Sequence, residues 1–93
     1  MELKVNDILD VSLHVRDENN KTIYSVTYFN NGMIYSSADV PMPKDFGYLD
    51  IEEWIEEDIE SFLPEISDYE ILEITDFGEF QSATIRIKAL KEV

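Results

Sequence analysis

The sequence predicts an α+β domain: an antiparallel sheet of about five strands with one amphipathic, acidic helix packed on one face. Three observations indicate this class. Most of the chain alternates apolar and polar residues, as half-buried strands do, while one segment, from about residue 51 to residue 62, has apolar residues at helical spacing. Asn, Gly and Pro separate these segments. The expected order is three strands, the helix and two more strands, in a single domain spanning residues 1–93.

The first predicted strand spans residues 10–17. Apolar residues from Val11 to Val15 alternate with polar ones, and Asp17-Glu18-Asn19-Asn20 supplies turn residues directly afterwards. Residues 1–9 fit either a short strand or a helical turn.

Residues 22–29 are rich in β-branched and aromatic side chains, which predicts a second strand. Asn31-Gly32 then favours the positive φ angles of a type I′ hairpin turn, so a third strand returns over residues 33–38. Pro41 and Pro43 each remove a backbone donor. We expect them to end the third strand and to begin a crossing segment towards the helix.

Asp50 is the predicted N-cap of the helix. Glu53 completes a capping box with it, and Leu49 and Trp54 occupy the positions of a hydrophobic staple. Pro64 disfavours helical geometry at the residue before it, and so ends the helix. The apolar residues at three- and four-residue spacing are Ile51, Trp54, Ile55, Ile59 and Phe62.

Two further strands follow the helix. Residues 69–75 form the first of them, and Phe77-Gly78-Glu79 supplies the turn. Residues 81–90 form the last strand, because Ala83, Ile85 and Ile87 alternate with polar residues.

Acidic residues are concentrated in the second half of the chain. Between Lys44 and Arg86 lie 41 consecutive residues that hold 14 of the 21 acids and no Lys, Arg or His. The remaining 7 acids match the 7 Lys and Arg, so this block alone accounts for the net charge of −14. A concentrated negative field repels nucleic acid and anionic membranes and favours basic partners. We therefore expect a basic protein as the partner, with no direct binding of nucleic acid or membrane.

The composition is that of a folded protein in a reducing compartment. Hydrophobic residues make up 44% of the chain, which is more than a disordered acidic tail contains, and there is no cysteine. The first residues lack the basic start and apolar stretch of a signal peptide, and no run approaches the roughly 20 apolar residues of a membrane span. We expect a cytoplasmic protein.

Five glutamates of the helix turn away from its apolar stripe. They are Glu52, Glu53, Glu56, Glu57 and Glu60. At about 1.5 Å per residue they place one charge per ~2.4 Å of helix, close to the one per ~1.7 Å of duplex DNA. Like charges four residues apart destabilise a helix, so we expect a functional reason for them; a solvated face that keeps the protein soluble is the alternative. Asp58 falls at the edge of the apolar arc, where we expect a rim position that reaches water, with a partner-facing anchor as the alternative.

Catalytic and metal-binding patterns are weak. His14 is the only imidazole and shares a strand face with Asp10, Ser12 and Arg16, but neighbours two apart on a strand are about 6.6 Å apart, too far for a nucleophile-to-base hydrogen bond. The two Asp-Phe-Gly triplets lack the glycine loop and catalytic loop of kinases. No segment offers the alternating oxygen ligands of a calcium loop. We expect neither an enzyme nor a metal site, and no cofactor.

In size, acidity, absence of cysteine and mixed α/β pattern, the chain resembles small DNA-mimicking inhibitors, mostly from phages: anti-restriction proteins, anti-CRISPR proteins and uracil-DNA glycosylase inhibitors. The acidic segment from Asp50 to Glu60, followed by Ser61, looks like the Glu-Ser and acidic-helix region of the glycosylase inhibitors, in which the Glu-Ser pair precedes the helix. The resemblance implies that carboxylates replace phosphates in the basic groove of a nucleic-acid-binding enzyme. It transfers no residue role.

We expect the partner to contact the acidic helix face and an extension of it along the next strand. The candidate residues are Glu52, Glu53, Glu56, Glu57, Glu60, Asp68, Glu70, Glu73 and Glu79. Tight binding also requires aromatic anchors. The candidates are Phe46, Tyr48, Phe77 and Phe80, although core filling is the first expectation for each. An immunity protein against a nuclease toxin would show the same features, and the competing class is an acidic interaction or accessory domain that binds a basic protein without imitating nucleic acid.

Overall fold

The computed structural model describes residues 3–43, 50–61 and 65–91. It contains a five-stranded antiparallel sheet and one helix, in the predicted order, and so confirms the α+β class. The elements are β1 (Ile8–Glu18), β2 (Lys21–Asn30), β3 (Met33–Pro43), α1 (Ile51–Ser61), β4 (Ile66–Asp76) and β5 (Phe80–Leu90).

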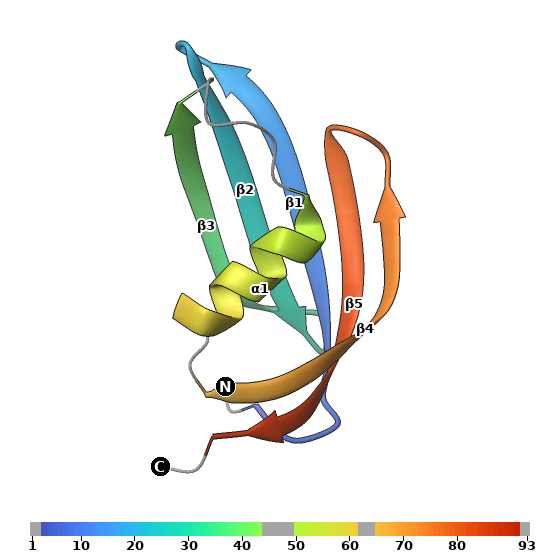
Figure 1. The fold of residues 1–93 in the computed structure, drawn as a ribbon. Helices are drawn as coiled ribbons and strands as arrows, with labels where there is room; N and C mark the ends of the chain where they lie inside the picture. The colour runs from blue at the N-terminus through green and yellow to red at the C-terminus, as the bar shows by residue number, and fades with distance from the viewer. Residues whose placement is uncertain (1–2, 44–49, 62–64, 92–93) are drawn as a thin grey trace.

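The strands are arranged in the order β3-β2-β1-β5-β4, so β1 is the central strand and β3 and β4 are the two edges. The helix lies across one face of the sheet (Figure 1). β4 and β5 bend strongly along their length, and β4 begins beneath the helix before it rises along the edge of the sheet (Figure 1). Irregularities in the β4–β5 register, around Asp68 and between Ile71 and Glu73, accompany this bend.

Both N-terminal hairpins close through two residues with positive φ. Asn31 and Gly32 have φ angles of 54° and 78°, which confirms the predicted type I′ geometry. Asn19 and Asn20, at 51° and 64°, form the equivalent turn between β1 and β2. The turn is therefore shorter than predicted, because Asp17 and Glu18 belong to β1.

β3 is longer than the sequence predicted. It continues through Pro41 and Pro43, which pair with Ile23 and Lys21 of β2, so the expectation that these prolines end the strand was wrong. The physical reason is the position of β3 at the sheet edge. Backbone nitrogens two residues apart point to the same side of a strand, and on the outer side of an edge strand no neighbour needs a donor.

The start of α1 is held by two side-chain acceptors. Asp50 Oδ1 accepts the Glu53 backbone N–H at 2.9 Å, which confirms the N-cap. Gln81 Oε1, on β5, accepts the Ile51 N–H at 3.0 Å. Leu49 of the predicted staple and the predicted last helical residue, Phe62, lie outside the described residues.

The core lies between α1 and the sheet face turned towards it. Alternate residues of β1, β2 and β5 supply the sheet side, and the Tyr24 and Trp54 rings meet with their centroids 5.1 Å apart. Leu3 adds to the core from an N-terminal segment that contains a turn, with Ile8 and Leu9 already in β1. Within the described part of the chain, no helix has the length and apolar character required to cross a membrane.

Candidate partner-binding surface

The five glutamates on α1 are all exposed, as the sequence predicted. Within the described residues none of them is in an ion pair or accepts a side-chain hydrogen bond. Only Glu52 and Glu53 lie in the first turn, where the helix dipole favours acids, and the last turn contains no base. The helix therefore displays uncompensated carboxylates on its outer surface.

Tyr69 of β4 shows where one row of these carboxylates lies. Burial raises the pKa of its hydroxyl above the ordinary value, and the negative charges of Glu56, Glu52 and Glu60 raise it further. The row of glutamates four residues apart is thus on the flank of α1 that faces β4. An anionic field of this kind disfavours any further negative charge beside it.

The acids of β4 differ from those of the helix. Arg86 of β5 contacts Glu70 at 2.6 Å, and Lys88 lies 4.0 Å from Asp68. Because the block itself contains no Lys, Arg or His, we expected its acids to have no cationic neighbours, and this expectation is wrong at these two positions. It failed because β4 and β5 are adjacent antiparallel strands, which puts the basic residues after the block opposite the acids within it.

Two further predicted acids also lie apart from the helix row. Glu73 pairs in register with Thr84, whose neighbours Ala83 and Ile85 point into the core, so Glu73 is on the sheet face opposite α1. Glu79 is exposed in the turn between β4 and β5. The nine predicted residues therefore form a helix group of five and a dispersed β4–β5 group of four.

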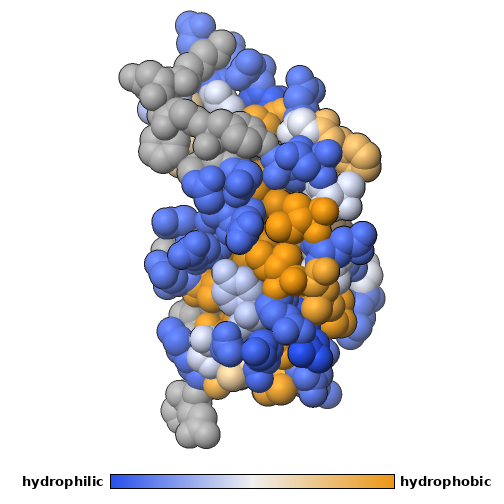
Figure 2. Space-filling model, turned by 45° about the vertical axis from the view of Figure 1, so that its right-hand side comes forward, coloured by the Kyte–Doolittle hydropathy of each residue, from blue (hydrophilic) through white to orange (hydrophobic). Residues whose placement is uncertain are grey.

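The β4–β5 hairpin carries exposed hydrophobic side chains. Figure 2 shows a strip of hydrophobic residues between hydrophilic ones on this side of the molecule. The exposed hydrophobic residues of the hairpin are Leu72, Ile74, Phe77 and Phe80. Phe80 pairs in register with His14 and therefore lies on the sheet face opposite α1. Phe77 is 73% exposed and Phe80 is 45% exposed, so core filling was the wrong expectation for both. Phe46 and Tyr48 lie outside the described residues.

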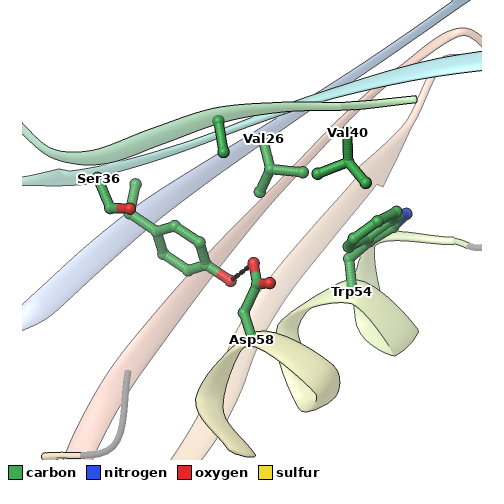
Figure 3. A pocket seen from close by; sticks show the side chains of 7 residues that line it. Val26, Ser36, Val40, Trp54 and Asp58 are labelled. Carbon is green, nitrogen blue, oxygen red and sulfur yellow. Dashed lines mark hydrogen bonds between the residues drawn. The ribbon is translucent and has the colours of Figure 1, made fainter. Parts of the chain in front are cut away.

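Asp58 is the principal correction to the sequence analysis. It is only 8% exposed, and the Tyr28 hydroxyl donates a 2.8 Å hydrogen bond to its Oδ2 atom (Figure 3). Burial raises the pKa of the Asp58 carboxyl and Glu57 raises it further, while the hydrogen bond from Tyr28 lowers it. Asp58 is therefore an interior carboxylate rather than a rim residue. Sequence reasoning missed its partner because Tyr28 lies 30 residues away on β2.

Asp58 also lines a cavity of about 110 Å³ between α1 and the β2–β3 side of the sheet. The walls are Val26, Tyr28, Ser36, Ala38, Val40, Trp54 and Asp58. Figure 3 shows the Asp58 side chain directed from the helix towards the sheet, on the same side of α1 as Trp54. The Trp54 ring N–H is buried and finds no acceptor among the described residues.

The face opposite α1 contains the former catalytic candidates in an ordinary surface arrangement. Arg16 donates to Ser25 at 2.6 Å and lies 3.7 Å from Asp39, so it is occupied within the sheet. His14 is exposed beside the Phe80 ring, 6.2 Å away between centroids. No group of three His, Asp or Glu in the described ranges is placed to hold a metal ion.

Comparison of the chain with protein-family models, with curated proteins and with solved structures finds no match. The site must therefore be interpreted from its own geometry and charge.

Proposed function

We propose that this chain is an acidic inhibitor that occupies the basic nucleic-acid-binding groove of another protein. The observation that carries the proposal is the row of exposed helix glutamates, which form no ion pair with any described residue, whereas Asp68 and Glu70 of β4 do. Their spacing of roughly one charge per 2.4 Å approaches that of a duplex backbone. A surface of this kind fits a groove lined with Lys and Arg.

The expected mechanism is competition. Carboxylates on the helix take the positions of phosphates, and the opposite fields of the two proteins accelerate their association. The helix group, Glu52, Glu53, Glu56, Glu57 and Glu60, is the proposed contact. The β4–β5 group contributes to the long-range field only. A phage inhibitor and an immunity protein against a nuclease toxin are both consistent with this mechanism, and both would act in the cytoplasm.

A second candidate function has its own supporting observation. Leu72, Ile74 and Phe77 expose apolar surface on the β4–β5 hairpin, and imitation of a phosphate backbone does not require it. An acidic interaction domain would bind a basic partner through both surfaces without displacing nucleic acid. This candidate predicts that replacing apolar residues of the hairpin with polar ones weakens binding as much as removing charges from the helix does.

Capture followed by competition separates the two candidates. The tagged protein is used to capture partners from a bacterial lysate at low salt, and duplex or single-stranded DNA is then added. Release of the captured protein by nucleic acid supports the inhibitor. A partner retained at saturating nucleic acid, and lost when Leu72 and Phe77 are replaced by Ser, supports the interaction domain and rejects mimicry.

A further inference from the structure

The cavity beside Asp58 exists because small side chains face the helix there. Ser36, Ala38 and Val40 of β3 occupy the core-facing positions opposite Tyr28, Val26 and Tyr24 of β2. Ala38 is exposed even though it points to the helix side of the sheet, because the cavity opens over it. An ordinary core would fill this volume with a larger aliphatic residue.

The cavity holds one charge-bearing group that lacks a counter-ion. Asp58 Oδ2 accepts the hydrogen bond from Tyr28, but Oδ1 has no partner among the described residues, and the charge of the adjacent Glu57 is also negative. A carboxylate that is 8% exposed normally pairs with a cation, since desolvating it alone is costly. No Lys or Arg among the described residues forms an ion pair with Asp58, so a cation bound at this carboxylate would come from a partner.

The shape and chemistry of the cavity favour an alkylammonium group. A volume of 110 Å³ holds about four non-hydrogen atoms, judged by a benzene-binding cavity of roughly 150 Å³ in an engineered protein. Three of the lining residues, Asp58, Ser36 and Tyr28, carry side-chain oxygens that can accept a hydrogen bond. An ammonium has three donors, whereas a guanidinium has five. Val26 and Val40 suit the methylene stem, and the Trp54 ring stabilises a nearby cation.

We propose that this cavity receives the side chain of a lysine from the basic partner, with the ammonium on Asp58. The proposal rests on the proposed function in so far as the partner is basic. It goes further by assigning an anchoring pocket on the β3 side of α1, on the opposite flank of the helix from the carboxylate row beside Tyr69. Binding would then combine a diffuse charge contact with one desolvated ion pair, which is how a charged interface gains specificity.

The test uses n-butylammonium, a lysine side-chain analogue, and the fluorescence of Trp54, the only tryptophan in the chain. At constant ionic strength, butylammonium should give a saturable change in Trp54 fluorescence. The dissociation constant should lie in the millimolar range expected of so small a ligand. 1-Butanol, which has the same stem without the charge, should bind about tenfold more weakly or not at all. Equal binding of the two ligands, or the absence of saturation, would overturn the proposal. Tighter binding of methylguanidinium would overturn the assignment to lysine.

Matched variants locate the binding. Asp58→Asn removes the cavity charge, while Glu53→Gln removes one charge from the exposed helix face as a control. Butylammonium affinity should fall by about tenfold in the first variant and stay within about twofold in the second. If Asp58→Asn does not fold, Ala38→Leu tests the site instead, because it fills the cavity and leaves every charge in place. Butylammonium affinity should then fall. Unchanged affinity in Ala38→Leu would reject the site.

Because these measurements contain no partner, they remain valid if the inhibitor proposal fails. If butylammonium binds but nucleic acid does not displace the captured partner, the pocket proposal stands and mimicry is rejected. If nucleic acid displaces the partner but butylammonium does not bind, mimicry stands and the pocket proposal is rejected.

Discussion

The side-chain carbonyl of Gln81 accepts the backbone N–H of Ile51 at a distance of 3.0 Å. This bond joins the first turn of α1 to β5, and Gln81 is only 1% exposed. The first N–H groups of a helix have no partner within the helix, and Gln81 satisfies one of them inside the core. The position of the acidic helix on the sheet therefore depends on a buried polar residue as well as on apolar packing.

Replacing Gln81 with Met should destabilise the fold. The substitution keeps the length of the side chain but leaves the Ile51 N–H buried without an acceptor, which costs about 1–3 kcal/mol. Urea unfolding measures the loss. Ser82→Ala, at the adjacent half-buried position, is the control and should stay within about 0.5 kcal/mol. Equal stability of wild type and Gln81→Met would show that the bond does not hold the helix.

The stability contribution of Asp58 should depend on pH. Because the pKa of Asp58 is raised in the folded state above its ordinary value of 3.8, the folded protein binds a proton more readily than the unfolded chain. Stability from this group is therefore present at low pH and is lost as pH rises from about 3.8 through the folded-state pKa. Tyr28 and Glu57 are the groups that influence it.

Asp58→Asn should remove the loss of stability that the Asp58 carboxyl causes as pH rises. Its free energy of unfolding relative to wild type should increase as pH rises from 3 to 7, because the titration of the remaining acids is common to both proteins and cancels in the difference. Urea titrations at several pH values measure it. A difference that is constant across this range would contradict the raised pKa.

Glu56→Lys should stabilise the isolated protein while weakening its proposed binding. The lysine lies four residues from both Glu52 and Glu60, so two repulsive pairs become attractive, for a gain of about 1 kcal/mol at low salt. Thermal unfolding in low and high salt measures the gain, which should shrink as salt rises. A destabilised variant would mean that the helix row is not self-repulsive, and that its carboxylates need no functional explanation.

The Asn31-Gly32 turn should not tolerate a β-carbon at its second position. Gly32 has a φ of +78°, which costs an L-residue about 1–2 kcal/mol, so Gly32→Ala should lower stability by about this amount. The surrounding space is open, so the effect isolates the backbone conformation. Asn20→Gly, at a φ of +64° in the other hairpin, is the converse change and should not destabilise by more than about 0.5 kcal/mol. A loss of stability in Asn20→Gly but not in Gly32→Ala would refute the type I′ assignment.

Local patterns predicted the elements of this fold well, and partners distant in sequence were missed. The Asn31-Gly32 hairpin and the Asp50 cap depend on neighbouring residues, and both are confirmed. The persistence of β3 through Pro41 and Pro43 depends on the strand being an edge, which local sequence does not reveal.

The same limit applies to the site. The helix glutamates follow from helical periodicity, and their exposure is confirmed. The pairing of Glu70 with Arg86 and the burial of Asp58 against Tyr28 depend on which strands and helix faces meet. A predicted order of elements does not specify those neighbours, since the same order is compatible with several sheet arrangements.

The most direct test of the account is the salt dependence of binding to a purified, captured partner. Two triple variants are compared with wild type: Glu52, Glu56 and Glu60 replaced by Gln on the helix, and Asp10→Asn, Glu18→Gln and Glu73→Gln on the opposite sheet face. Both remove three charges, but only the first should markedly lower affinity, flatten the decline of affinity with salt and abolish displacement of DNA. Equal effects of the two variants would show that net charge alone drives binding, and would contradict the helix face as the mimic of a nucleic-acid backbone.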